Sequence, residues 1–218
     1  MEVIGPAGAG KTTLCQALDC HTESIKLDNF PDVRKVSNAP FFILHGLPLI
    51  PKLLYLYQPN SRQLTRREFA WMTILSGWST LLRWRMKNGG KVIVLDQGPI
   101  YLLAEMRIFG PEYLRRKSAE RLWRDLYDRW IAALHAVVWL DAADEILFER
   151  IRTRQQEHIV KAASALTAYQ FLDRYRTEFE HILSVLTARG AKLRIIRIDT
   201  GLQPARDVVS QFLAELNC

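Results

Sequence analysis

Short apolar runs alternate with longer amphipathic segments along the chain. The longer segments repeat apolar residues every three or four positions, which is typical of helices packed on one face. The short runs are continuous, as in strands buried on both sides of a parallel sheet. The predicted strands are Val3-Ile4, Ser24–Leu27, Lys91–Leu95, Ala136–Leu140 and Leu193–Ile198. The predicted helices are Thr13–Leu18, Arg62–Lys87, about Pro111–Leu134, Asp144–Arg154, Ala165–Leu186 and Ala205–Leu216.

This alternation predicts a single α/β domain over residues 1–218. Parallel strands joined by helices require right-handed crossovers, so we expect a parallel sheet covered by helices on both faces. The chain is 49% hydrophobic and 24% charged, which is typical of a globular protein. Its 218 residues suffice for one sizeable core and are too few for two.

Residues 39–57 form one long apolar run, which Pro48, Pro51, His45 and Lys52 interrupt. The prolines and polar residues argue against a transmembrane helix. One interpretation is a kinked helical segment that is buried or lines a pocket. The alternative is an apolar acceptor site or an interfacial patch.

A complete GxxxxGK[ST] motif, Gly5 to Thr12, lies between the first predicted strand and helix. Such a loop wraps phosphates with its backbone amides and the N-terminus of the following helix. Lys11 is expected to reach the outer phosphates and Thr12 to bind Mg²⁺. A flexible glycine turn is the alternative, which the flanking strand and helix disfavour. The expected nucleotide-binding residues of the motif are Gly5, Ala7, Gly8, Ala9, Gly10, Lys11 and Thr12.

Net charge and cysteines add little to this picture. The formal charge of +7 fits a protein that binds phosphates, and also one that binds nucleic acid or an anionic membrane. Cys15, Cys20 and Cys218 are an odd number without CxxC spacing, so a disulfide framework is not expected. No signal peptide precedes the loop, and we expect a cytoplasmic protein.

Three aspartates follow predicted strands, where ligands bind in parallel sheets. Asp96 is a candidate to hold Mg²⁺ with Thr12 or to accept a proton from an attacking hydroxyl. Asp28 is a candidate general base near an acceptor hydroxyl, or else a turn residue. Asp141 precedes a helix start, and all three also fit helix-entry roles.

Arginines at the end of a predicted helix form the third chemical feature. Arg150 and Arg154 lie four positions apart and therefore on one helical face, with Arg152 between them. Guanidinium groups on a mobile segment would neutralise a phosphoryl group during its transfer. The alternative is a solvated basic face at a helix C-terminus.

Taken together, these motifs resemble the P-loop nucleoside and nucleotide kinases, and most closely the thymidylate-kinase-like group. The resemblance covers Gly5 to Thr13, Val94-Leu95-Asp96, the segment from Val137 to Arg154, and Ile198-Asp199-Thr200. It implies a five-stranded parallel sheet and an ATP-binding role for Thr13. It also implies a lid at about 150–163 whose Arg150 and Arg154 contact ATP, and an adenine-side loop containing Asp199 and Thr200. Residues 31–88 would form the acceptor-side helical region.

The sequence departs from this family where an acceptor would bind. Gln97 follows Asp96 where the family usually has an arginine that binds the acceptor phosphate or the transition state. The sequence therefore predicts an ATP- and Mg²⁺-dependent kinase with a small-molecule acceptor, a nucleoside or nucleotide being favoured. A kinase for a sugar, lipid-linked or nucleic-acid-end acceptor and a non-catalytic ATP-binding module are the alternatives. A homodimer is left open.

Overall fold

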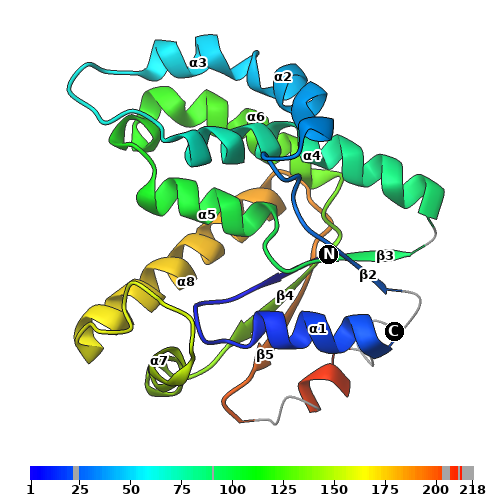
Figure 1. Cartoon of the computed structure of the whole chain (residues 1–218), viewed down its shortest axis with the longest axis vertical. Helices are drawn as coiled ribbons and strands as arrows, with labels where there is room; N and C mark the ends of the chain where they lie inside the picture. The colour runs from blue at the N-terminus through cyan, green and yellow to red at the C-terminus, as the bar shows by residue number, and fades with distance from the viewer. Residues whose placement is uncertain (22–24, 90, 203–206, 211, 213–218) are drawn as a thin grey trace.

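A parallel sheet of five strands forms the centre of the molecule, with strand order β2-β3-β1-β4-β5 (Figure 1). The computed structural model describes residues 1–218 except 22–24, 90, 203–206, 211 and 213–218. The strands are β1 (Glu2–Ile4), β2 (Ile25–Asp28), β3 (Val92–Leu95), β4 (Ala136–Asp141) and β5 (Arg194–Asp199). The predicted α/β fold with a five-stranded parallel sheet is confirmed.

Strand β1 is the middle strand and pairs in parallel with β3 on one side and β4 on the other. Val3 of β1 lies opposite Val138 of β4. Strand β4 pairs in turn with β5, where Ala136 lies opposite Arg194. The loop after β1 therefore leaves the centre of the sheet, at the edge where all five parallel strands end.

Helices cover both faces of the sheet, as predicted. Successive residues of β4 point to opposite faces: Val137 and Trp139 join one buried cluster, whereas Val138 and Leu140 join the other. The first cluster lies under α4, α5 and α6, and the second under α1 and α7, while α8 contributes to both. These helices are α1 (Lys11–His21), α4 (Arg66–Gly89), α5 (Pro99–Phe109), α6 (Glu120–Ile131), α7 (Asp144–Thr153) and α8 (Ala165–Ala188).

The helices differ from the prediction in two places. Helix α5 was not predicted; Pro99 occupies its first turn, where a proline costs no hydrogen bond. Ile100, Leu102, Leu103, Ala104 and Met106 are buried around much of the circumference of α5, so the helix has no clear amphipathic period. The helix predicted over Pro111–Leu134 begins only at Glu120, after two short 3-10 turns, Glu112–Arg115 and Lys117–Ala119.

The closing helix predicted over Ala205–Leu216 falls partly outside the described residues. Residues 207–210 and 212 are helical, and Val208, Val209 and Phe212 are buried in the second cluster.

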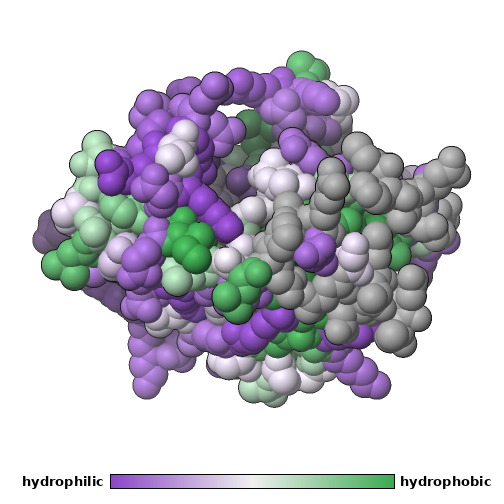
Figure 2. All heavy atoms as spheres, turned by 90° about the horizontal axis from the view of Figure 1, so that it is seen from below, coloured by the Kyte–Doolittle hydropathy of each residue, from purple (hydrophilic) through white to green (hydrophobic). Residues whose placement is uncertain are grey.

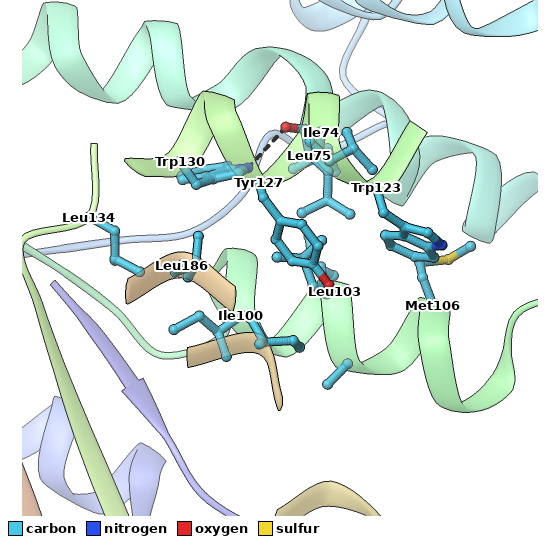
Figure 3. Packing of buried hydrophobic residues seen from close by; sticks show 14 of the residues in the cluster. Ile74, Leu75, Ile100, Leu103, Met106, Trp123, Tyr127, Trp130, Leu134 and Leu186 are labelled. Atoms are coloured by element: carbon cyan, nitrogen blue, oxygen red, sulfur yellow. Dashed lines mark hydrogen bonds between the residues drawn. The ribbon is translucent and has the colours of Figure 1, made fainter. Parts of the chain in front are cut away.

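Large side chains fill the space between α4, α5, α6 and α8 (Figure 3). Trp130 of α6 donates its indole N–H to the Leu75 carbonyl oxygen at 3.0 Å, and its ring meets Trp78 edge-on at 5.9 Å. Met106 and Leu103 of α5 face the same space (Figure 3). This packing fixes α5, and with it the segment that follows Asp96.

The apolar run 39–57 folds as two short helices, α2 (Ala39–Gly46) and α3 (Leu49–Leu56), after a 3-10 turn at Val36–Asn38. Segments Val36–Gly46 and Leu49–Leu56 meet at an angle of 55°. The predicted kink is therefore confirmed, but only one side of the pair is buried: Leu49, Leu53 and Leu56 join the core.

Among the described residues, no single helix has the length and hydrophobicity that crossing a membrane would take. The bent pair of α2 and α3 meets that test only by its combined length and composition.

Candidate functional site

The loop between β1 and α1 adopts a conformation that its glycines make possible. Gly5 and Gly8 have positive φ angles of 150° and 84°. A Cβ atom on Gly5 would lie 2.1 Å from the Leu140 carbonyl oxygen, and one on Gly8 would lie 2.7 Å from that of Leu147. Both positions therefore exclude any side chain, because the loop lies directly against β4 and α7.

The N-terminus of α1 opens onto a cavity of about 1000 Å³. The first hydrogen bond of the helix runs from the Leu14 N–H to the Gly10 carbonyl oxygen at 3.0 Å. The backbone amides before Leu14 therefore have no partner within the helix. These amides and the helix dipole make this end of the cavity electropositive. The loop and helix residues that line the cavity include Gly5, Ala7, Gly8, Ala9, Gly10, Lys11, Thr12 and Thr13.

Lys11 lies inside this loop. Its Nζ atom donates to the Gly5 and Pro6 carbonyl oxygens at 2.8 Å and 2.9 Å. Burial lowers the pKa of Lys11 to about 8; nearby Asp96 partly offsets this effect, and Arg154 adds to it. The ammonium group is thus held, poorly hydrated, at the end of the cavity where an anion would be stabilised most strongly.

Thr12 and Asp96 meet at the same end of the cavity. The Thr12 hydroxyl donates to Asp96 Oδ2 at 3.0 Å, although the two residues are 84 positions apart. Asp96 Oδ1 is buried and has no hydrogen-bond partner among the described residues. A hydroxyl and a carboxylate with an unused oxygen fit Mg²⁺, which binds few protein oxygens and keeps waters and phosphate oxygens as its other ligands.

Arg150 and Arg154 both line the cavity, but their surroundings differ. Arg150 lies within α7 and donates to the Thr200 carbonyl oxygen at 2.8 Å and to the Thr200 hydroxyl at 3.1 Å. Arg154 follows the end of α7, and its buried Nε has no hydrogen-bond partner among the described residues. Arg150 therefore joins α7 to the loop after β5, whereas Arg154 has donor capacity left for a ligand.

The predicted lid at 150–163 comprises the last turn of α7 and part of the irregular connection to α8. Of the two arginines, only Arg154 belongs to that connection. Lys161 holds it locally by donating to the Arg154 carbonyl oxygen at 2.7 Å.

The loop after β5 contributes one of its two expected residues. Thr200 lines the cavity and is buried, with its amide donating to the Asp141 carbonyl oxygen at 2.7 Å. Asp199 is not among the described residues that line the cavity; its carboxylate accepts the Gly201 amide at 2.7 Å. Asp141 itself pairs with Arg176 of α8, which also holds Asp144 at the start of α7.

Asp28 is not brought together with the other candidates. It is not among the described residues that line the cavity, and its carboxylate forms an ion pair with Arg85 of α4. The turn interpretation also fits, because the Asn29 amide donates to Asp28 Oδ1 at 3.1 Å.

The sequence of this chain matches a known protein family. A sequence model of a family described as an AAA domain matches residues 2–165. The chain belongs to this AAA domain family. A search of curated proteins found no match to this chain.

Two kinases are among the solved structures similar to this chain. A deoxyadenosine kinase from M. mycoides, with bound dATP, superposes with a TM-score of 0.55 at 14% identity, covering 100% of this chain and 98% of that chain. Thymidylate kinase from Candida albicans superposes with a TM-score of 0.57 at 16% identity, covering 99% and 89%. The chain therefore has the fold of these kinases, as the resemblance implied.

The sequence did not reveal the aromatic residues that line the cavity. They are Tyr101 of α5, Phe171 and Tyr175 of α8, and His158. The Tyr175 hydroxyl donates to Glu105 of α5, and burial together with this carboxylate raises the pKa of Tyr175. The four-residue spacing of Phe171 and Tyr175 was the one available signal, and it is equally typical of a core-facing helix.

Glu2 is a second residue that the sequence did not reveal. Although it lies in β1 and is completely buried, its carboxylate accepts the amides of Gly98, Ile100 and Tyr101 at 2.9–3.1 Å. A Cβ atom on Gly98 would lie 2.6 Å from this carboxyl group. Glu2 thus caps α5 and fixes the segment between Asp96 and Tyr101, both of which line the cavity.

Replacing Glu2 with glutamine is expected to change how stability depends on pH. Burial raises the pKa of Glu2 from 4.5 to about 7, against the opposing effect of the three amides. Because the folded protein then binds the proton more tightly than the unfolded chain, the Glu2 contribution is present below pH 4.5 and lost as pH rises through 7. The free energy of unfolding of the wild type should fall relative to Glu2→Gln by about 3 kcal/mol over this range.

Chemical denaturation of both proteins at several pH values tests this expectation. The difference between the two curves isolates position 2, because all other titrating groups are shared. A difference that stays flat with pH would show that the amides outweigh burial and keep the carboxylate ionised.

Proposed function

We propose that this protein is an ATP- and Mg²⁺-dependent kinase that transfers the γ-phosphoryl group to a small-molecule acceptor. The observation that supports it best is the unused polar capacity in one cavity. Asp96 Oδ1 and Arg154 Nε are buried without partners in the described chain, and both residues line the cavity beside Lys11. Unpaired buried polar groups cost free energy, so their presence indicates that a ligand completes them.

Each residue of the site would have a separate role. ATP would supply the phosphoryl group, and Mg²⁺ would neutralise part of the phosphate charge. The loop amides and Lys11 would bind the phosphates, and Thr12 and Asp96 would hold Mg²⁺. Arg154 would stabilise the negative charge on the group in transfer, while Arg150 positions the loop of Thr200. In the alternative role of Asp96, its Oδ1 atom would accept a proton from the acceptor hydroxyl instead of contacting the metal.

The aromatic lining of the cavity suits an uncharged, flat acceptor. Among the described lining residues, the permanent cations are Lys11, Arg150 and Arg154, and Lys11 and Arg154 would be occupied by the phosphates of ATP. Burial and then the neighbouring Arg154 and Lys11 lower the pKa of His158, so its imidazole is neutral at pH 7. Aromatic side chains bind the faces of flat rings, and hydroxyl groups orient polar edges. A nucleoside is therefore the favoured acceptor, ahead of a nucleotide.

Formation of ADP from Mg²⁺-ATP should be tested against nucleosides, nucleoside monophosphates, sugars and short oligonucleotides. We expect nucleosides to stimulate ADP formation more than their monophosphates do. Stimulation by sugars or oligonucleotides alone would refute the acceptor assignment. ATP binding without any stimulated turnover would favour a non-catalytic nucleotide-binding module.

Replacing Arg154 with glutamine is expected to lower kcat by about a hundredfold, because the substitution removes a cation beside the transferred group. Arg152→Gln is the matched control: Arg152 is exposed and lies over the Phe148 ring at 5.7 Å. This control should retain activity within about twofold, as is usual for exposed sites away from the chemistry. Steady-state kinetics of the two variants test this prediction. An equal loss of kcat in both variants, or no loss in Arg154→Gln, would show that Arg154 has no role in the transfer.

A further inference from the structure

Helices α2 and α3 carry apolar side chains on two sides. One side is buried against the helical layer through Leu49, Leu53 and Leu56. The other side is exposed, and three- and four-residue steps connect its members across the bend. We name it the α2–α3 surface; its residues, which are 40–85% exposed, are Ile43, Leu44, Leu47, Ile50, Leu54 and Tyr55.

Such a surface is unusual for a helix that faces water. An amphipathic helix normally places polar residues opposite its buried side, but the charged residue within α2 and α3 is Lys52 alone. At the opposite end of the molecule, which Figure 2 shows from below, hydrophobic residues lie in separate clusters among hydrophilic ones in the described part. Contiguous exposed apolar surface of this kind marks an interaction site.

The charges around the α2–α3 surface indicate its partner. Between Asp32 and Glu68 the sequence contains no acidic residue. Arg34 and Lys35, directly before the 3-10 turn that precedes α2, are exposed and form no ion pair with a described residue. Lys52 pairs with Asp125 of α6 at 2.7 Å, and Arg62 pairs with Glu68 of α4 at 2.6 Å. The basic residues of this stretch are Arg34, Lys35, Lys52, Arg62, Arg66 and Arg67.

These charges disfavour a second copy of the chain as the partner. A two-fold interface would place the same basic stretch on both sides of the contact, where like charges repel. Asp125, the acidic residue that contacts this stretch from α6, is already paired with Lys52. An anionic surface matches both the apolar side chains and the cations.

We propose that the α2–α3 surface binds the anionic surface of a lipid bilayer. Apolar side chains of interfacial helices enter the boundary between headgroups and acyl chains, while nearby cations bind anionic headgroups. Since Leu49, Leu53 and Leu56 remain in the protein core, the helix pair lies along the bilayer surface. This association is separate from the chemistry of the cavity, whose described lining contains no residue of α2 or α3.

Co-sedimentation of the full chain with lipid vesicles tests the proposal. The probes are vesicles of phosphatidylcholine with phosphatidylglycerol, vesicles of phosphatidylcholine alone, and both at low and high salt. We expect binding to the anionic vesicles that weakens as salt rises. Leu44→Gln/Leu54→Gln should weaken binding at least about tenfold, and Arg34→Gln/Lys35→Gln by about tenfold.

The matched control is Trp84→Gln/Leu166→Gln, which removes two apolar side chains with similar exposure, 63% and 67%, from other helices. It should bind vesicles as the wild type does, and circular dichroism should show that every variant is folded. The proposal is overturned if the wild type does not bind anionic vesicles or if Leu44→Gln/Leu54→Gln binds them equally well. It is also overturned if sedimentation velocity shows a dimer that this variant dissociates, since the surface would then join two copies.

Discussion

Replacing Lys11 with alanine is expected to lower phosphoryl transfer by about a thousandfold or more, while the protein stays folded. Lys11 is the cation enclosed by the phosphate-binding loop, where low solvation strengthens its attraction for phosphate oxygens. Its removal should not unfold the protein, because the lowered pKa shows that burying this charge already costs stability.

Initial rates of ADP formation, together with thermal melting, measure the two parts of this prediction. Lys192→Ala is the matched control, because Lys192 is exposed and its replacement removes the same charge as Lys11→Ala. The control should retain the wild-type rate. An active, folded Lys11→Ala protein would contradict the assignment of the loop to phosphoryl transfer.

Replacing Asp96 with asparagine is expected to lower kcat by about a hundredfold or more and to raise the Mg²⁺ concentration needed for half-maximal rate. The substitution keeps the shape of the side chain and removes the charge beside Thr12. Asp28→Asn is the informative comparison, because Asp28 also follows a strand but pairs with Arg85 outside the described cavity lining.

Asp28→Asn should retain activity within about threefold and lose only modest stability, as for a partly exposed ion pair. Titration of both variants with Mg²⁺, followed by pH–rate profiles, distinguishes the roles of the two carboxylates. A large loss in Asp28→Asn with little change in Asp96→Asn would instead make Asp28 the general base.

The parts of the site that depend on local sequence were predictable. The phosphate-binding loop is a contiguous motif, and its geometry follows from glycines at fixed spacing between a strand and a helix. Asp96 was found by its place after an apolar strand, because parallel strands end at one edge of the sheet. The pairing of Thr12 with Asp96 across 84 positions agrees with that placement.

The parts that depend on tertiary packing were not predictable. Helix α5 is apolar around much of its surface, since it is buried between α8 and the α4–α6 layer, so periodicity could not reveal it. Glu2 reads as a polar residue near the start of a chain, and only the fold shows that it caps α5. The contact between Tyr175 and Glu105 joins helices 70 positions apart, which no local pattern encodes.

The exposed side of α2 and α3 illustrates the same limit. The sequence showed a kinked apolar run and left a buried segment and an interfacial patch as alternatives. Both descriptions hold for different sides of the helices: Leu53 is buried, whereas its neighbour Leu54 is 66% exposed. Which side of a short helix faces the core depends on the layer beneath it.

Direct transfer of the γ-phosphoryl group is the central claim, and it separates a kinase from an ATPase. The decisive measurement follows the label from ATP radiolabelled at the γ-phosphate, in the presence of the acceptor that best stimulates ADP formation. We predict that the label appears in the phosphorylated acceptor in amounts equal to the ADP formed, and that Lys11→Ala produces neither the labelled acceptor nor ADP. Label recovered only as inorganic phosphate would contradict this account and show that the cavity hydrolyses ATP.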